Sequence, residues 1–198
     1  IMIVGIHGKM GAGKSTVADS LVTILKDDFN INSTIKSFAT PIYNLISLLF
    51  DETVEEIKLN KNTLVRPRTF MGQRTYRELL QNVGMFVRDN ADEDVWVNAL
   101  FGNNNDKILQ DWTFNGHEWW IIDDLRFYNE FHRIKDIGGI NIKVNRDITN
   151  NLDDDIKNNG SEVNLDYIDW KEWDLFLNNN NSIDITKNLL KEYITTIL

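Results

Sequence analysis

Apolar and polar positions along this chain follow two kinds of pattern, which predict strands and helices in turn. Short apolar runs are suited to strands that are buried on both faces of a sheet. Longer stretches that repeat apolar residues every three or four positions predict helices. The strand-type runs lie at residues 2–6, 33–39, 118–123, 140–144 and 173–177. The helical patterns lie at residues 15–25, 41–49, 73–90, 92–101, 127–137 and 185–198.

The order of these elements predicts an α/β fold. Strands that alternate with helices form a parallel sheet, because right-handed crossovers place the helices on its two faces. The chain has 198 residues, 42% of them hydrophobic, and is long enough for one substantial core. We therefore predict a single domain over residues 1–198, with a five-stranded parallel sheet and helices on both faces. In such sheets ligands bind beyond the carboxyl ends of the strands.

The segment between the first strand and the first helix carries the strongest functional signal. Residues 8–15, the phosphate loop, fit the pattern G-x-x-x-x-G-K-[ST], and the flanking strand and helix disfavour a chance match in a glycine-rich turn. Glycines let the backbone wrap its N–H groups around phosphate oxygens, and the helix N-terminus adds partial positive charge. Lys14 is expected to reach the β- and γ-phosphates of ATP, and the Ser15 hydroxyl to hold Mg²⁺. The expected triphosphate-binding residues are Gly11, Ala12, Gly13, Lys14, Ser15 and Thr16.

Composition excludes several classes of site. The chain has no cysteine, which rules out disulfides, thiolate metal sites and cysteine nucleophiles. Its three histidines are scattered without the spacing of a zinc site. A formal net charge of −9 disfavours nucleic-acid binding, because phosphate backbones attract clustered Lys and Arg. No apolar run approaches the roughly 20 residues that span a bilayer, so we expect a soluble cytoplasmic protein with no membrane partner.

Positive charge is nevertheless concentrated in residues 58–88, the basic stretch. It contains seven Lys and Arg residues and a single acidic residue, Glu78. A positive segment in an acidic protein suits a second anion site for a small phosphorylated substrate. A solvated basic face explains the same pattern, and both interpretations stay open. The basic residues are Lys58, Lys61, Arg66, Arg68, Arg74, Arg77 and Arg88.

The helix predicted at the end of the basic stretch separates a polar stripe from an apolar face. At about 100° per residue, Arg77, Gln81, Gly84 and Arg88 fall within about 60° of one another. The arginines can bind phosphate oxygens, the amide can contact a base edge, and the glycine admits a ligand close to the backbone. An exposed face also tolerates Arg and Gln, but a glycine there costs about 1 kcal/mol relative to alanine. The opposite face, expected to be core, carries Tyr76, Leu79, Leu80, Val83, Phe86 and Val87.

A third group of polar residues follows the strand predicted at residues 118–123. Asp123 and Asp124 stand where a triphosphate-binding enzyme needs a carboxylate near its metal, and the pattern does not decide between them. Arg126 can stabilise charge on a transferred phosphoryl group. Glu130 lies one helical turn later and can orient the Arg126 guanidinium. Capping of the strand end, with a surface ion pair, is the alternative interpretation.

Taken together, these stretches resemble the deoxynucleoside monophosphate kinases of bacteriophages, members of the P-loop nucleoside monophosphate kinase superfamily. The resemblance implies a P-loop NTPase fold with a helical monophosphate-binding region at about residues 41–101 and a short lid-like loop at about residues 146–162. It also implies transfer of the ATP γ-phosphoryl group to a dNMP, which gives ADP and a dNDP. The matching stretches are residues 8–16, 38–41, 77–84, 94–97, 124–130 and 161–162, together with Arg88.

The resemblance also assigns expected roles to residues, with ATP and Mg²⁺ as cofactors. Arg146, beside the lid-like loop, is expected to close over the phosphates. The expected catalytic residues are Lys14, Asp124 and Arg126, and the expected ligands of Mg²⁺ are Ser15 and Asp123. The residues expected to line the monophosphate site are Phe38, Arg77, Gln81, Gly84, Arg88, Trp96, Asp124, Arg126 and Glu130.

Two other functions stay open. A P-loop kinase for another small acceptor, such as a sugar acid or dephospho-coenzyme A, shares the phosphate loop and differs in its acceptor helix. A nucleotide-gated switch without phosphoryl transfer is disfavoured, because the Asn-Lys-x-Asp motif expected of a GTPase is absent. The expected partners are ATP and a dNMP, and the tryptophan-rich stretches leave a homodimer open.

Overall fold

Strands and helices alternate along the chain in the computed structural model, which describes residues 2–63, 74–103, 106–107, 118–147 and 164–198. Arg66 and Arg68 of the basic stretch lie outside these ranges, as do residues 148–162 of the expected lid-like loop. None of the helices within the described ranges is long and apolar enough to cross a membrane.

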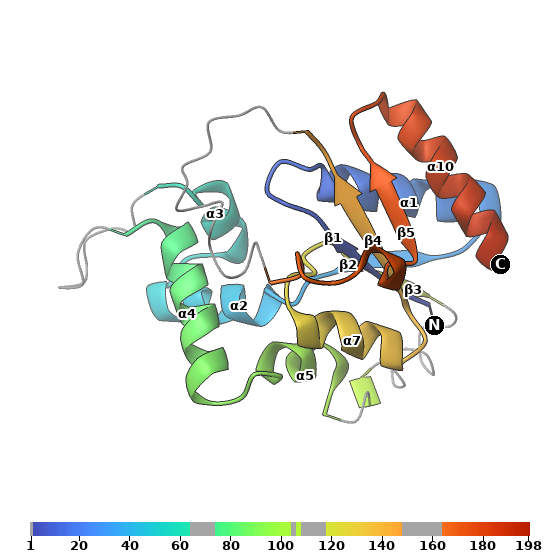
Figure 1. The fold of residues 1–198 in the computed structure, drawn as a ribbon. Coiled ribbons are helices and arrows are strands. Elements are labelled where there is room, and N and C mark those ends of the chain that lie inside the picture. Colours follow the sequence, from blue (N-terminus) through green and yellow to red (C-terminus); the bar gives the residue numbers. More distant parts are fainter. Residues whose placement is uncertain (1, 64–73, 104–105, 108–117, 148–163) are drawn as a thin grey trace.

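The strands form one five-stranded parallel sheet, which confirms the predicted fold class. Their order across the sheet is β2-β3-β1-β4-β5, so that β1 lies in the middle. Val4 of β1 pairs with Ile121 on one side and with Ile140 on the other. The carboxyl ends of all five strands therefore meet at one edge, with the phosphate loop at its centre (Figure 1). The strands are β1 (Ile3–His7), β2 (Ser33–Lys36), β3 (Trp119–Ile122), β4 (Ile140–Asn145) and β5 (Leu175–Asn178).

Each face of the sheet buries its own set of helices, because side chains alternate along a strand. Val4 and Ile6 of β1 point toward α1 and α10, which pack against each other. Ile3 of β1 and Ile122 of β3 belong to the apolar cluster on the opposite face, with α5 and α7. These four helices are α1 (Lys14–Phe29), α5 (Val95–Phe101), α7 (Tyr128–Asp136) and α10 (Ile183–Ile197).

Three further helices lie together to one side of the sheet and are called the helical group here (Figure 1). Ile46 and Ile57 are fully buried in an apolar cluster that belongs to this group alone. The sequence did not predict the middle helix, because six residues are too few to display an apolar repeat. The group consists of α2 (Thr40–Phe50), α3 (Val54–Leu59) and α4 (Tyr76–Asn90).

Two details of the predicted elements were wrong. The second strand ends at Lys36 rather than at residue 39, because the chain turns there into α2. Phe86, expected in the core, is 67% exposed. The reason is that the buried residues of α4 are Tyr76, Leu80 and Gly84, spaced four apart, and at about 100° per residue Phe86 lies on another side of the helix.

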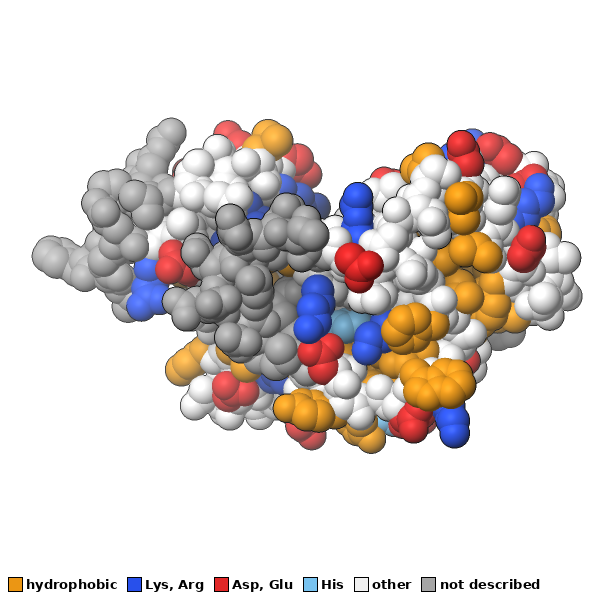
Figure 2. All heavy atoms as spheres, turned by 45° about the horizontal axis from the view of Figure 1, so that its top comes forward, with side chains coloured by type: hydrophobic (Ala, Val, Ile, Leu, Met, Phe, Trp, Pro, Cys, Tyr) orange, Lys and Arg blue, Asp and Glu red, His pale blue; other side chains and the backbone are white. Residues whose placement is uncertain are grey.

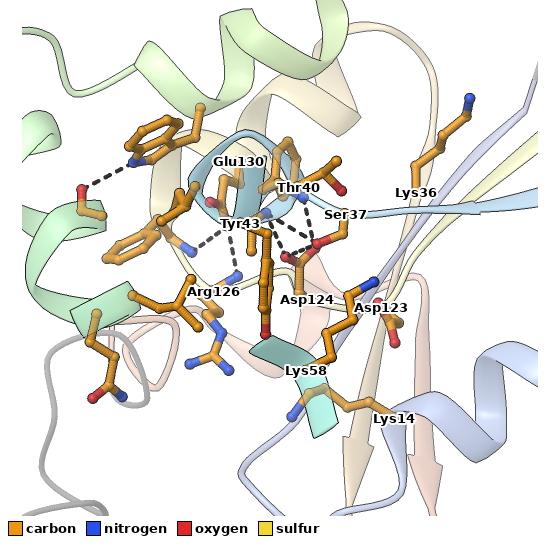
Figure 3. Close-up of a pocket in the computed structure, with 18 of the residues that line it drawn as sticks. Lys14, Lys36, Ser37, Thr40, Tyr43, Lys58, Asp123, Asp124, Arg126 and Glu130 are labelled. Atoms are coloured by element: carbon orange, nitrogen blue, oxygen red, sulfur yellow. Dashed lines mark hydrogen bonds between the residues drawn. The ribbon is translucent and has the colours of Figure 1, made fainter. Parts of the chain in front are cut away.

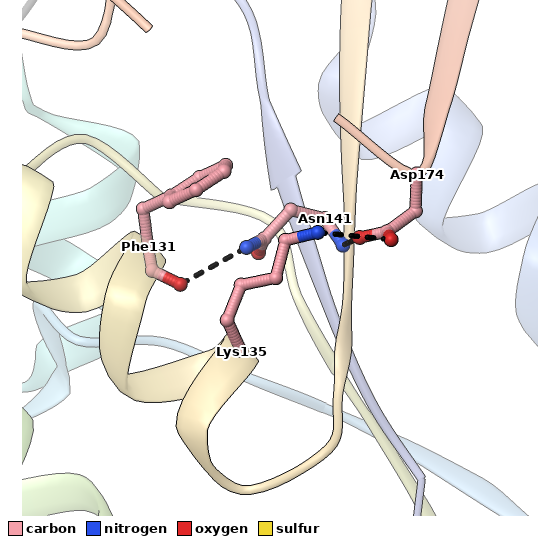
Figure 4. A network of polar contacts seen from close by, with 4 residues as sticks. All are labelled: Phe131, Lys135, Asn141 and Asp174. Carbon is pink, nitrogen blue, oxygen red and sulfur yellow. Dashed lines mark hydrogen bonds and ion pairs between the residues drawn. The ribbon is translucent and has the colours of Figure 1, made fainter. Parts of the chain in front are cut away.

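A polar network centred on the buried Asn141 side chain ties α7 to the last two strands (Figure 4). The Asn141 side chain, fully buried, donates to the Phe131 carbonyl oxygen at 3.0 Å, and its backbone N–H donates to Asp174 at 2.7 Å. Asp174 also pairs with the Lys135 ammonium at 3.0 Å. The Asn141 side chain leaves no room beside β1, because a methyl group on Gly5 would lie 2.5 Å from its Oδ1 atom. Glycine at position 5 is therefore required for packing.

Gly5→Ala is expected to lower the free energy of unfolding by about 1–3 kcal/mol or more, because the new methyl group would overlap Asn141 and Ile134. Gly138→Ala is the comparison variant. Its methyl group would meet nothing within 4 Å, so that only the φ of +77° opposes alanine, at about 1 kcal/mol. Urea unfolding of the three proteins measures both losses. A loss in Gly5→Ala no larger than that in Gly138→Ala contradicts the packing argument.

Candidate functional site

A pocket of about 570 Å³ opens between the carboxyl edge of the sheet and the helical group. Seen from the side of the strand ends, the surface is notched, with Lys and Arg side chains on both sides of the notch (Figure 2). The pocket brings together most of the predicted site residues, from elements far apart in the sequence. Those that line it are Lys14, Ser15, Phe38, Arg77, Gln81, Gly84, Trp96, Asp123, Asp124, Arg126 and Glu130.

The phosphate loop has the backbone geometry that its glycines predict. Gly11 and Gly13 have φ values of 82° and 92°, in the left-handed region that other residues avoid. The Lys14 ammonium donates to the Gly8 carbonyl oxygen at 2.5 Å, so that its side chain lies along the loop. No side chain caps the first turn of α1, whose N-cap residue is Gly13. The N–H groups of this turn can therefore serve an anion.

Ser15 and Asp123 form a pair beside the loop. The Ser15 hydroxyl donates to the Asp123 carboxylate at 3.1 Å. Burial, and then the neighbouring Asp124 carboxylate, raise the pKa of Asp123, while the Ser15 hydrogen bond and the Lys14 charge oppose the shift. Among the described residues no three His, Asp or Glu side chains gather into a metal site. A hydroxyl and one carboxylate suit Mg²⁺, which keeps several waters and takes its other ligands from phosphates.

The Asp124 carboxylate is engaged differently from that of Asp123. It accepts hydrogen bonds from the Ser37 hydroxyl at 2.7 Å and from the backbone N–H groups of Phe38 and Ala39 at 3.0 Å each (Figure 3). Asp124 thereby fastens the end of β3 to the start of α2. The two neighbouring aspartates thus have separate partners. Asp123 accepts from Ser15 of the phosphate loop, whereas Asp124 accepts from residues 37–39.

Glu130 is buried under the segment that carries Arg126. Its carboxylate accepts from the backbone N–H groups of Arg126 at 2.7 Å and of Phe127 at 2.9 Å. The sequence suggested a contact with the Arg126 guanidinium, whereas these hydrogen bonds hold the Arg126 backbone. Burial and then the Asp124 charge raise the pKa of Glu130 to about 8, against the two backbone N–H groups and Arg88, which lower it.

The polar stripe of α4 faces the pocket over only part of its length. Arg77 and Gln81 line the pocket, and the Arg77 Nε atom donates to the Asn62 side chain at 2.9 Å. Gly84 accepts from the Trp96 indole N–H at 3.0 Å, and a methyl group on Gly84 would lie 3.0 Å from Ile42. Gly84 therefore also serves the packing of α4 against α2 and α5.

Arg88 departs from the expectation, because it is not among the residues that line the pocket. Its guanidinium donates to the Glu93 carbonyl oxygen and to the Asn129 side chain, both at 3.0 Å. It also lies 4.1 Å from the centre of the Phe127 ring. Arg88 thus joins α4 to α7. Arg146 is exposed after β4 and does not line the pocket either.

Two lysines of the basic stretch do line the pocket, although sequence reasoning gave them no individual role. Lys58 and Lys61 lie with their ammonium groups 5.5 Å and 5.4 Å from the centre of the Tyr43 ring. The concentration of positive charge indicated an anion site in this segment. The spacing of residues did not show which cations would line it, and Arg74, for example, is exposed. Tyr43 offered no signal beyond its place in an apolar helix.

Comparison with known proteins adds one near-complete sequence match. No family model matches the chain. The chain is 30% identical over 192 residues to a protein of Acanthamoeba polyphaga mimivirus named "Putative deoxynucleotide monophosphate kinase", with 93% of this chain and 91% of that protein covered. Among solved structures, shikimate kinase from Bacteroides thetaiotaomicron aligns over 98% of both chains, with 14% sequence identity and a TM-score of 0.40.

Glu130 is expected to make stability depend on pH. Because its pKa in the folded protein, about 8, exceeds the ordinary 4.5, the folded state holds a proton that the unfolded chain releases. This contribution is complete below pH 4.5 and is lost as the pH rises toward 8. Its slope is at most about 1.4 kcal/mol per pH unit.

Glu130→Gln keeps an acceptor oxygen for both N–H groups and cannot ionise. The free energy of unfolding of this variant, relative to the original protein, is therefore expected to rise steadily between pH 5 and pH 8, a window set by the raised pKa. Urea titrations at several pH values measure this difference. A difference that stays constant across the range contradicts the raised pKa.

Proposed function

Because this chain belongs to the deoxynucleotide monophosphate kinase family, we propose that it transfers the γ-phosphoryl group of ATP to a deoxynucleoside monophosphate. The observation that carries this proposal is a single pocket with cationic side chains from two sources. Lys14 comes from the phosphate loop, whereas Lys58 and Arg77 come from the helical group. Lys14, Lys58 and Arg126 lie around one space in Figure 3. Two phosphorylated substrates can therefore meet there.

The donor side of the pocket consists of the phosphate loop and Asp123. Its backbone N–H groups and Lys14 bind the β- and γ-phosphates of ATP. Ser15 and Asp123 would hold Mg²⁺, which supplies neutralisation of phosphate charge when bound. In the reaction the bond between the γ-phosphorus and the β,γ-bridging oxygen breaks. A new bond forms from the γ-phosphorus to an oxygen of the acceptor phosphate, and ADP keeps the bridging oxygen.

The acceptor side consists of side chains from the helical group and from the segment between α3 and α4. Lys58, Lys61 and Arg77 attract the monophosphate, while Gln81 offers an amide to the base. Arg126 neutralises charge on the phosphoryl group in transit. The acceptor phosphate is already an anion, so that no general base is needed. Alignment and charge neutralisation account for the chemistry.

Two residues expected from the resemblance to act on substrate take another role in this proposal. Asp124 positions the start of α2, because its carboxylate accepts three hydrogen bonds from residues 37–39. Arg88 positions α4 relative to α7 through Glu93 and Asn129. Both are positioning residues, which hold the groups that touch substrate.

A coupled assay of ADP release tests the proposed function. The protein is incubated with ATP, Mg²⁺ and each member of a panel of dNMPs, NMPs, sugar acids and dephospho-coenzyme A. ADP formation that requires a dNMP supports the proposal. ATP turnover that no monophosphate stimulates contradicts the proposal and favours a nucleotide-gated switch. ADP formation that requires a sugar acid or dephospho-coenzyme A would identify a kinase of that acceptor instead.

Arg126→Ala is expected to lower kcat by on the order of 10²-fold or more, because it removes a cation from the phosphoryl group in transit. Steady-state kinetics with saturating ATP and dNMP measure the loss. Circular dichroism and thermal unfolding check that the variant is folded. Near-normal turnover by a folded variant excludes this role for Arg126.

Arg77→Ala is expected to raise KM for the dNMP by about tenfold or more, since a hydrogen bond to a charged group contributes about 1.5–3 kcal/mol. KM for ATP should stay within about twofold, because Arg77 lies in α4 rather than in the phosphate loop. Arg74→Ala is the matched control, since it removes the same charge from an exposed position three residues earlier. Equal effects of the two substitutions on KM for the dNMP would show that only overall charge matters.

A further inference from the structure

The asparagine run at residues 178–181 contacts the phosphate loop through Asn179. The Asn179 side-chain amide donates to the Ala12 carbonyl oxygen at 2.8 Å, across a sequence separation of 167 residues. Its side-chain oxygen accepts from the Thr186 hydroxyl at 3.0 Å, and its backbone N–H donates to the Asn145 carbonyl oxygen at 2.8 Å. As a stretch of sequence this run predicts only a polar loop. The contacts place Asn179 between the phosphate loop and α10.

The peptide bond that Asn179 contacts is one that could rotate easily. It joins Ala12 to Gly13, and the φ of Gly13, which is 92°, is one of the two backbone torsions that set the direction of this peptide plane. Glycine adopts positive and negative φ at similar cost, so that the backbone alone does not fix the direction of this peptide plane. In a trans peptide the C=O and N–H groups point in opposite directions. A hydrogen bond from Asn179 to the Ala12 carbonyl oxygen therefore directs the Gly13 N–H away from Asn179.

The direction of the Gly13 N–H matters because the loop binds phosphate through such groups. The contact is close, since a methyl group on Gly13 would lie 2.4 Å from the Asn179 amide nitrogen. Thr186 is 2% exposed, at the start of α10, and its hydroxyl fixes which end of the Asn179 amide faces the loop. α10 in turn packs on α1, the helix that follows the loop. Asn179 is thus hydrogen-bonded to α10, which packs on the helix that follows the phosphate loop.

We propose that Asn179 is a positioning residue that locks the Ala12–Gly13 peptide in the orientation required for triphosphate binding. It touches the phosphate loop, so that its loss should weaken ATP binding before it affects the acceptor. The inference rests on the proposed function only as far as ATP binding. It does not depend on which acceptor is phosphorylated.

The test is direct binding of a fluorescent ATP analogue, mant-ATP, with Mg²⁺ and without any acceptor. Asn179→Asp keeps the size of the side chain and the bond to Thr186, but its carboxylate cannot donate to Ala12. Asn181→Asp is the matched control, because it adds the same charge at an exposed position two residues away. Asn179→Asp is expected to raise Kd for mant-ATP at least tenfold over Asn181→Asp. Thermal unfolding of the nucleotide-free proteins checks the fold.

Thr186→Val provides a second route, should the Asn179 variant fail to fold. It leaves Asn179 in place, removes the hydroxyl that orients its amide, and should raise Kd for mant-ATP severalfold. With a dNMP that the original protein accepts, KM for that dNMP should stay within about twofold in all variants. Equal affinities of Asn179→Asp and Asn181→Asp for mant-ATP overturn the proposal, and so does a parallel loss of dNMP and ATP affinity. Weakened mant-ATP binding in a protein that phosphorylates no dNMP supports this inference while the proposed function fails.

Discussion

The close passage of the phosphate loop over the carboxyl ends of the central strands is the constraint on which the site depends. A methyl group on Gly8 would lie 2.6 Å from the Val144 carbonyl oxygen of β4, so that the chain can leave β1 at this point only as glycine. Behind it, Gly5 lies against the buried Asn141 side chain. The loop is therefore seated on the sheet before any nucleotide binds. Its position then fixes where Lys14 and Ser15 can reach.

Two carboxylates and an amide near the pocket hold together the segments that surround it. Asp124 fastens α2, Glu130 fastens the backbone of Arg126, and Asn129 receives Arg88. The two carboxylates accept from backbone N–H groups, and a buried N–H group left unpaired would cost about 1–3 kcal/mol. Burial, and then the charge of the neighbouring Asp124, raise the pKa of both Asp123 and Glu130. The carboxylates of this region therefore hold neighbouring segments in place, and the Asp124 charge also raises the pKa of the carboxyl groups beside it.

Sequence patterns predicted the sheet, most helices and the phosphate loop, because these depend on local periodicity and on one dense motif. They carry no information on which elements meet in space. Arg88 has the same helical phase as Arg77, yet α4 extends past the pocket and brings Arg88 to Asn129 instead. Asn179 is separated from Ala12 by 167 residues, and nothing in a run of asparagines indicates that one of them contacts the loop. The aspartate pair was ambiguous for a similar reason, since only the fold shows that Asp123 is the one beside Ser15.

If two anion sites share one pocket, a single compound that carries both substrates should occupy them together, and a competition titration with such a bisubstrate compound measures this. The compound is adenosine joined to a deoxynucleoside through five phosphates. It should displace both mant-ATP and a labelled dNMP, and bind at least about 10²-fold more tightly than ATP or the dNMP, because the second contact becomes intramolecular. Displacement of mant-ATP alone, with an affinity no higher than that of ATP, would show that the two sites do not share one pocket.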